Sequence, residues 1–207
     1  MGDPAWNIGA AALQRLQALH VHHTPEMNPE APVIWTIGHS TRAADDFLVL
    51  LVANAIEAVA DVRRHAGSRK HPQFNPSALA ASLQRHGIEY VPMPELGGRR
   101  KPRADSHNTL WRNESFRGYA DYMETPAFAA AIERLLVLAR RKRTAMLCAE
   151  AVWWRCHRSL IADWLKTGGV EVRHILGPGK NEVHPWSSAA QLIDGRLSYA
   201  PRMDRLL

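Results

Sequence analysis

The chain of 207 residues is long enough for one well-buried domain, and 46% of its residues are hydrophobic, as in ordinary globular proteins. No apolar run is long enough to span a bilayer, the first residues lack the pattern of a signal peptide, and two cysteines are too few for a disulfide framework. We therefore expect a cytoplasmic protein without a membrane partner. The formal net charge of +6 indicates an anionic partner, either a nucleotide or a nucleic acid.

Residues 1–31 are predicted to be an N-terminal arm that ends in a linker. A short helix is expected at residues 10–19, and three prolines between positions 25 and 32 favour a linker after it. Strands and helices then alternate along the chain up to residue 177. The apolar strands are expected at residues 33–37, 58–63, 88–91, 144–147 and 170–176. The helices are expected at residues 45–52, 76–86, 116–123, 126–141 and 159–165.

This alternation predicts an α/β fold. We expect a single domain at residues 32–177, with a mainly parallel five-stranded sheet and helices on both faces, in Rossmann-like or flavodoxin-like layers. Residues 178–207 are expected to be a C-terminal tail, in which Asp194 and Gly195 between apolar residues predict a hairpin turn. Ligands of parallel sheets bind beyond the carboxyl ends of the strands. The polar residues at those ends are expected to face one crevice, and they are His39, Ser40, Asp61, Arg63, Cys148 and Glu150.

Both cysteines lie in the segment that links the fourth strand to the helix at 159–165. Cys156 is placed where this helix begins, and the free N–H groups of a helix start lower the pKa of a thiol, as do the charges of His157 and Arg158. We therefore predict that Cys156 is a catalytic nucleophile, with a half-buried packing residue as the alternative. Cys148 is expected to belong to the core or to form a reversible disulfide with Cys156.

Three further residues are predicted to be catalytic, namely His157 and the two carboxylates Glu150 and Asp61. A carboxylate at the mouth of a sheet can act as general base, although each of these also has the option of pairing with an arginine to hold the loops in place. The residues predicted to bind substrate are arginines that can bind phosphate through two hydrogen bonds, polar residues after the first strand and one aromatic residue. They are His39, Ser40, Arg63, Arg69, Arg158 and Tyr119, with core packing as the alternative for Tyr119.

We expect neither a metal nor an organic cofactor. Cys148, Cys156 and His157 are ligand types, but structural zinc sites usually have paired short spacings such as Cys-x-x-Cys, which this sequence lacks. The sequence also contains no glycine signature of a dinucleotide-binding turn and no lysine-bearing phosphate loop.

Six short motifs occur in an order that resembles the "domain of unknown function 488" family. They are TIGHS at 36–40, DVR at 61–63, SR at 68–69, LGG at 96–98, CAE at 148–150 and CHR at 156–158. The resemblance extends from about residue 33 to residue 176, and His174 also fits its last strand. It implies a single α/β domain in a mostly bacterial group, and it implies no established reaction.

Two hypotheses from different classes remain open. The first is an enzyme with a cationic crevice of Cys, Glu, His and Arg side chains that acts on a phosphate-bearing substrate, such as a nucleotide or a nucleic acid. The second is a non-catalytic nucleic-acid-binding module in which the cysteines are structural and the arginines bind phosphate. The oligomeric state is left open.

Overall fold

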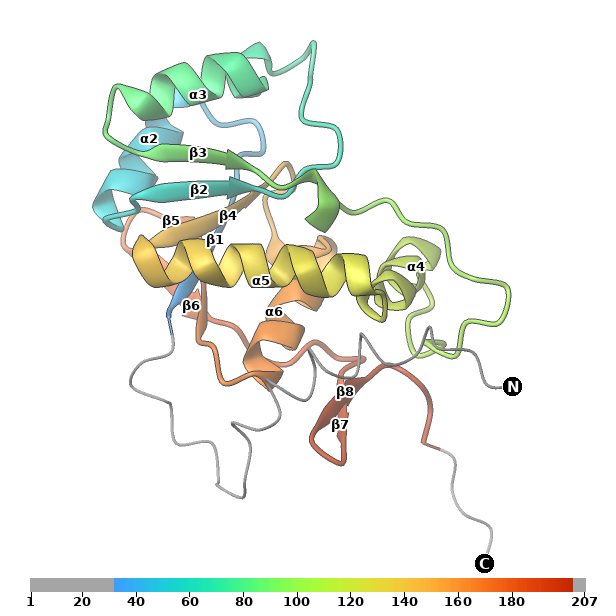
Figure 1. Cartoon of the computed structure of the whole chain (residues 1–207). Coiled ribbons are helices and arrows are strands. Elements are labelled where there is room, and N and C mark those ends of the chain that lie inside the picture. The colour runs from blue at the N-terminus through green and yellow to red at the C-terminus, as the bar shows by residue number, and fades with distance from the viewer. Residues whose placement is uncertain (1–31, 203–207) are drawn as a thin grey trace, which may run out of the picture.

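Five parallel strands and one antiparallel strand form the central sheet of the protein (Figure 1). The computed structural model describes residues 32–202, and the helix expected at residues 10–19 lies outside them. The strands are β1 (Ile34–Gly38), β2 (Ala58–Asp61), β3 (Glu89–Pro92), β4 (Thr144–Cys148), β5 (Val172–Gly177) and β6 (Lys180–Val183). Their order in the sheet is β3-β2-β4-β1-β5-β6. The predicted α/β class and the mainly parallel sheet are confirmed.

The sixth strand was not expected, because β6 carries mostly exposed polar side chains and has no apolar pattern. It pairs antiparallel with β5 at the edge of the sheet, where one side of a strand can face water. The C-terminal hairpin is confirmed as β7 (Gln191–Ile193) and β8 (Arg196–Ser198). Its two turn residues, Asp194 and Gly195, both have positive φ, as a tight two-residue hairpin requires.

Helices cover both faces of the sheet (Figure 1). The helices α2 (Ala44–Ala53) and α3 (Pro76–Gln84) pack on one face, and α4 (Glu114–Met123), α5 (Pro126–Arg141) and α6 (Arg158–Thr167) pack on the other. Within residues 32–202, three short 3-10 helices lie in loops, namely η2 (Pro72–Phe74), η3 (Pro94–Leu96) and η4 (Trp153–Arg155). In the described part of the chain, no helix has the length and apolar character of a membrane span.

Side chains alternate between the two faces along each strand, which divides the polar residues at the carboxyl edge into two sets. Cys148 lies in the apolar cluster on the α6 face. Ala60 of the neighbouring strand β2 and Val62, the residue after that strand, also belong to that cluster, so Asp61 between them points to the α2 face. The structure therefore separates polar residues that the sequence suggested would line a single crevice.

The strands β1 and β4 are neighbours, and the chain leaves them in opposite directions. It runs from β1 through α2 to β2, and from β4 through α6 to β5. In open α/β sheets, ligands bind at such a switch point, beyond the carboxyl ends of the two strands. The two loops that begin there are joined by the bonds from His39 N to Cys148 O (3.0 Å) and from Ser40 N to Ala149 O (2.9 Å).

Gly38 allows these loops to approach each other closely. A Cβ atom at this position would lie 1.8 Å from the carbonyl oxygen of Glu150, a distance that no side chain can tolerate. The end of β1 therefore needs glycine so that the loop after β4 can cross it.

Candidate functional site: a buried cluster of two cysteines, a histidine and an arginine

Cys156 lies between η4 and α6, at the carboxyl edge of the sheet. Its Sγ lies 3.6 Å from Nδ1 of His157 and 3.4 Å from Nε of Arg158. The ligand atoms of Cys148, Cys156 and His157 are all within 4.8 Å of one another. We call these four residues the cysteine cluster. It is enclosed by protein, since Cys156 is only 3% exposed and Cys148 6%.

The imidazole of His157 is oriented by the main chain of the neighbouring strand. Its Nε2 lies 3.2 Å from the carbonyl oxygen of Val62, and a carbonyl oxygen only accepts, so Nε2 carries a proton. The Nδ1 atom therefore faces Cys156 either as an acceptor from the thiol or, after proton transfer, as a donor to the thiolate. Gly98 makes room for this ring, because a Cβ there would lie 2.8 Å from Nδ1.

Tyr119 packs beside the same imidazole, with 5.1 Å between the ring centroids. The tyrosine is fully buried, and its hydroxyl donates to the carbonyl oxygen of Leu96 at 2.7 Å. Burial raises the pKa of Tyr119 well above its usual value, so the ring stays neutral. Its contact is with His157, and its assignment to substrate binding stays a prediction.

The two cysteines have opposite pKa shifts. Burial acts to raise the pKa of Cys156, but a hydrogen bond with Cys148, both the charge and hydrogen bond of His157, and the charge of Arg158 outweigh it and hold that pKa well below its ordinary value. The hydrogen bond shared with Cys156, together with burial, raises the pKa of Cys148 well above the ordinary value. The arrangement therefore favours a thiolate at Cys156 that accepts a hydrogen bond from the Cys148 thiol.

All three branches of the Arg158 guanidinium are used inside the protein. Besides facing Cys156, it donates from NH1 to Oγ1 of Thr36 (3.3 Å) and from NH2 to the carbonyl oxygen of Glu150 (2.6 Å). Arg158 is only 1% exposed, so its charge acts on the cluster rather than on the surface. Glu150 takes part here through its main chain, while its side chain is exposed, and its catalytic assignment stays a prediction.

A second polar group lies on the α2 face of the sheet. Arg63 donates from Nε and NH2 to the two carboxylate oxygens of Asp61, at 2.8 and 2.6 Å, and Tyr90 donates its hydroxyl to the same carboxylate at 2.7 Å. Asp61 is thus paired with an arginine, which the sequence analysis gave as the alternative to a catalytic role. The NH1 of Arg63 lies 3.3 Å from Nε2 of His39, whose ring stacks on Phe74.

His39 is neutral at physiological pH in this environment. Burial lowers its pKa from 6.5 to about 4, and the charge of Arg63 acts in the same direction. The other two predicted binding residues differ in exposure. Ser40 is half-buried and has a positive φ of 50°, whereas Arg69 is exposed in the loop after β2. The roles of these residues in substrate binding stay predictions.

No role was predicted from the sequence for the polar residues behind Arg158, although two of them belong to the family motifs. Thr36 and His174 lie in apolar strands, and Asp163 and His184 are fully enclosed beside them. A polar residue inside a buried strand is a signal that can be read from sequence, because it needs a hydrogen-bond partner in the core. The identity of the partner, in contrast, depends on the fold.

Three residues of the cysteine cluster are also ligand types for a metal ion. Structural zinc sites take four protein ligands, whereas this group supplies three. The guanidinium at 3.4 Å from the Cys156 sulfur already balances the charge of one thiolate and would repel a cation. The geometry therefore fits a paired thiolate better than a metal centre.

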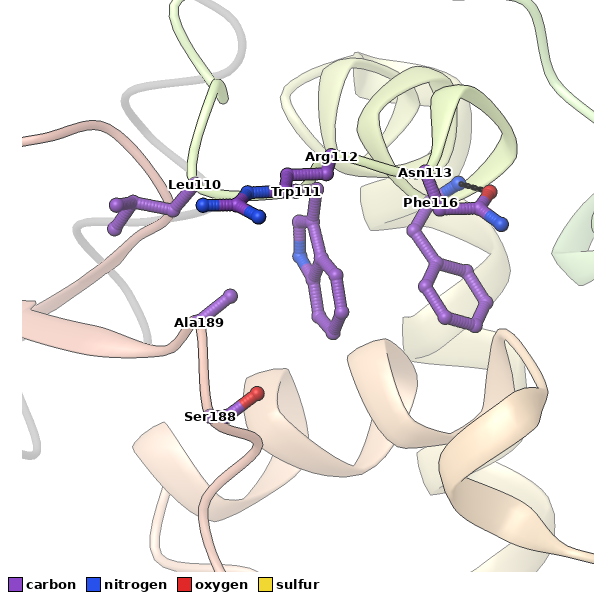
Figure 2. Close-up of a pocket in the computed structure, with 7 residues that line it drawn as sticks. All are labelled: Leu110, Trp111, Arg112, Asn113, Phe116, Ser188 and Ala189. Carbon is purple, nitrogen blue, oxygen red and sulfur yellow. Dashed lines mark hydrogen bonds between the residues drawn. The ribbon is translucent and has the colours of Figure 1, made fainter.

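An open pocket of about 350 Å³ lies apart from the predicted site residues. Figure 2 shows the indole of Trp111 in this pocket, between the loop that precedes α4 and the segment at Ser188 and Ala189. The indole also packs against Phe116 and Tyr199, with centroid distances of 4.8 and 5.7 Å. None of the residues predicted to be catalytic or substrate-binding lines it.

The fold and the cluster define an α/β protein with a buried, cation-paired cysteine at the carboxyl edge of its sheet. A family model described as "Domain of unknown function DUF488" matches residues 43–165, more than half of the chain. The chain belongs to this family, as its motifs indicated. The matched range contains the cysteine cluster but neither His39 nor His174. Searches of curated proteins and of solved structures find no match.

Proposed function

We propose that this protein is an enzyme that uses the Cys156 thiolate as a nucleophile on a phosphate-bearing substrate, such as a nucleotide or a nucleic acid. The observation that carries the proposal is the sulfur of Cys156 held between Nδ1 of His157 and Nε of Arg158. A thiolate with cationic partners at these distances is the usual form of an activated cysteine nucleophile.

The cluster supplies the groups that such a reaction needs. The Cys156 sulfur forms a bond to phosphorus while the bond from phosphorus to the leaving oxygen breaks. His157 holds at Nδ1 the proton taken from the thiol and returns it to the leaving oxygen. Water then attacks phosphorus and gives a proton to Nδ1 of His157 while the sulfur–phosphorus bond breaks, which releases the phosphoryl group as phosphate and regenerates the thiolate. Arg158 remains charged throughout and stabilises the thiolate before the attack.

Exposed arginines beside the cluster support a phosphate-bearing substrate. Arg64 donates to the carbonyl oxygen of Arg99 at 3.2 Å, and both side chains are exposed. Arg99 follows Gly98, the residue that packs on His157, and has a positive φ of 59°. Two guanidinium groups at this edge raise the local concentration of anions near the thiolate.

The rate of alkylation of each cysteine across pH, read by peptide mass spectrometry, tests the nucleophile. We expect Cys156 in the folded protein to react with an apparent pKa well below the free-thiol value of about 8.5. Cys156→Ser is the control that removes the signal. An inert Cys156, an ordinary apparent pKa, or one zinc ion per chain that protects both thiols would contradict the proposal.

The anionic substrate is tested by comparing a negatively charged reagent, iodoacetate, with neutral iodoacetamide. We expect the ratio of the two rates to fall when Arg64 and Arg99 are both replaced by Gln, because their charges attract the anion. Glu133→Gln serves as a control for charge changes elsewhere on the surface. An unchanged ratio in the double variant would remove these arginines from substrate binding.

The same exposed arginines favour nucleic-acid binding without catalysis as a second candidate. Under this reading, binding of single- or double-stranded nucleic acid falls steeply with salt and is retained in Cys156→Ser. Retained binding together with an unreactive Cys156 would favour the binding module over the enzyme.

A further inference from the structure

A continuous chain of hydrogen bonds runs behind the cysteine cluster and ends at a buried carboxylate. It leads from NH1 of Arg158 to Oγ1 of Thr36 (3.3 Å) and from Thr36 to Nδ1 of His174 (2.7 Å). It continues from Nε2 of His174 to Nδ1 of His184 (2.9 Å) and from Nε2 of His184 to Oδ1 of Asp163 (3.0 Å). No member of this chain is more than 1% exposed.

The carboxylate of Asp163 sets the direction of the whole chain. Its oxygens also accept from the main-chain N–H and hydroxyl of Ser187 and from the hydroxyl of Tyr199, so Asp163 acts as an acceptor. His184 must therefore donate from Nε2, and the Nδ1 of a neutral imidazole is then an acceptor. It follows that His174 donates from Nε2 to His184 and accepts at Nδ1.

Thr36 links the hydrogen bonds of the two histidines to Arg158, and the donor and acceptor roles on one side of it fix those on the other. Since Nδ1 of His174 accepts, the single hydroxyl proton of Thr36 is directed to that nitrogen. The Thr36 oxygen is left with lone pairs, and it accepts from the guanidinium. The chain cannot pass a proton on to Cys156, because an arginine in a protein does not lose its proton. The hydrogen-bond chain can therefore act on the thiol only by fixing the position of Arg158.

Two further observations agree with a neutral His174 that is held rigidly. Burial lowers the pKa of His174 from 6.5 to about 2, and the neighbouring His184 ring and the charge of Arg158 act in the same direction, so the His174 imidazole stays neutral. The indole of Trp153 stacks on the His174 ring at 4.4 Å with an interplanar angle of 8°. Trp153 belongs to η4, the same short element that precedes Cys156.

We propose that Thr36, His174, His184 and Asp163 are positioning residues that hold the Arg158 guanidinium against the Cys156 sulfur. The reactivity of the thiol then depends on the C-terminal segment, which supplies His184, Ser187 and Tyr199 from outside the range matched by the family model. This inference rests on the proposed role of Cys156 as a nucleophile.

The first test compares the pH profile of Cys156 alkylation in two Thr36 variants. Thr36→Val has the same shape but lacks the hydroxyl, and we expect its alkylation at about pH 6 to be about tenfold slower. Thr36→Ser keeps the hydroxyl and should restore the wild-type profile. The groups that face the sulfur are Cys148 from β4, His157 from the N-cap position of α6, Arg158 from α6 and neutral Tyr119 from α4.

The remote end of the chain is tested with His184→Gln, whose amide can still donate to Asp163 but does not reproduce the Nδ1 acceptor. We expect the same direction of change as in Thr36→Val. Thr167→Val is the matched control, because it removes a hydroxyl that bonds to the main-chain oxygen of Asp163 at 2.9 Å on the same helix, away from the chain. Its profile should follow wild type.

A second readout does not depend on the thiol. Nitrogen-15 NMR should show His174 and His184 as neutral tautomers with the proton on Nε2, and Arg158 Nε–H should exchange at least about tenfold faster in Thr36→Val than in wild type. A proton on Nδ1 of either histidine, or equal exchange in both proteins, would overturn the positioning role. An unreactive wild-type Cys156 with the expected NMR result would instead overturn only the proposed nucleophile.

Discussion

At the scale of single residues, the difference between the two cysteines comes from their neighbours and not from their burial. Both thiols are almost fully enclosed, and burial alone raises the pKa of both. The contacts with Nδ1 of His157 and Nε of Arg158, at 3.6 and 3.4 Å, are made by the sulfur of Cys156. Cys156 is therefore the cysteine that carries the negative charge, and Cys148 stays protonated and acts as a hydrogen-bond donor.

The donor role of Cys148 leads to a prediction about Cys156. Cys148→Ala removes the donor, so the apparent pKa of Cys156 should rise by about one unit. Cys148→Ser retains a hydroxyl donor and should give a smaller rise. Alkylation rates across pH measure both values. A Cys148→Ala profile that superposes on wild type would show that Cys148 only packs in the core.

The lowered pKa of His39 predicts how the stability of the folded protein depends on pH. Its pKa is 6.5 as a free group and about 4 in the folded protein, so the unfolded chain binds the proton more readily. Stability is therefore fully present above about pH 6.5 and is lost as the pH falls towards about 4, by about 3 kcal/mol in total. His174 acts in the same direction, because its pKa is also lowered.

Urea unfolding of wild type and His39→Gln between about pH 7 and pH 4 isolates the contribution of His39. We expect the variant to lose less stability over this range than wild type, because the glutamine does not titrate. Equal losses in the two proteins would show that the folded protein accommodates the protonated imidazole.

At the scale of elements, the site depends on the close crossing of the β1 and β4 loops. Glycine at position 38 leaves room for the carbonyl oxygen of Glu150, and that oxygen accepts from NH2 of Arg158. The end of β1 therefore helps to orient Arg158, a side chain of the helix α6 that follows β4. The cation that stabilises the thiolate is held by main-chain geometry as well as by Thr36.

Gly38→Ala should disturb this crossing. Its Cβ would collide with main-chain atoms, which cannot move as a side chain does, and we expect a loss of about 2–3 kcal/mol of stability with a raised apparent pKa of Cys156. Gly67→Ala is the matched control, because no atom lies within 4 Å of the added Cβ. Equal denaturant midpoints for the two variants would contradict this account of the crossing.

At the scale of the whole molecule, the segment after residue 177 is joined to the sheet and to the interior. β6 extends the sheet beside β5, and His184, Ser187 and Tyr199 surround the carboxylate of Asp163. Without them, a carboxylate on a buried helix face would lose most of its hydrogen bonds. The division into a domain at 32–177 and a tail at 178–207 remains a prediction that a truncation tests.

A chain that ends at residue 177 should fail to unfold cooperatively, because loss of the partners of a buried charge costs about 3–5 kcal/mol, a large part of the stability of a domain. A chain that ends at residue 202 keeps every described contact of Asp163 and is the control. Thermal unfolding followed by near-ultraviolet circular dichroism compares them. A cooperative transition of the shorter chain near that of the control would support an independent domain at 32–177.

The regular elements of the fold could be predicted because their signals are local. Short apolar runs indicated the five parallel strands, and Asp194 with Gly195 indicated the hairpin. β6 could not be predicted, since its polar residues become a strand only by pairing with β5. The location of the cysteine cluster was also predictable, because one cysteine ends a strand and the other lies just before the helix that follows it.

The α/β class, the family and the segment that carries the thiols could be predicted from hydrophobic periodicity and short motifs, because these depend on residues close together in the chain. Which polar groups meet depends instead on how the strands and helices pack. This packing pairs Asp61 with Arg63 on one face of the sheet and connects Arg158 through Thr36 to Asp163 on the other. The physical reason is that strand order and the alternation of side chains set these contacts between residues far apart in the chain.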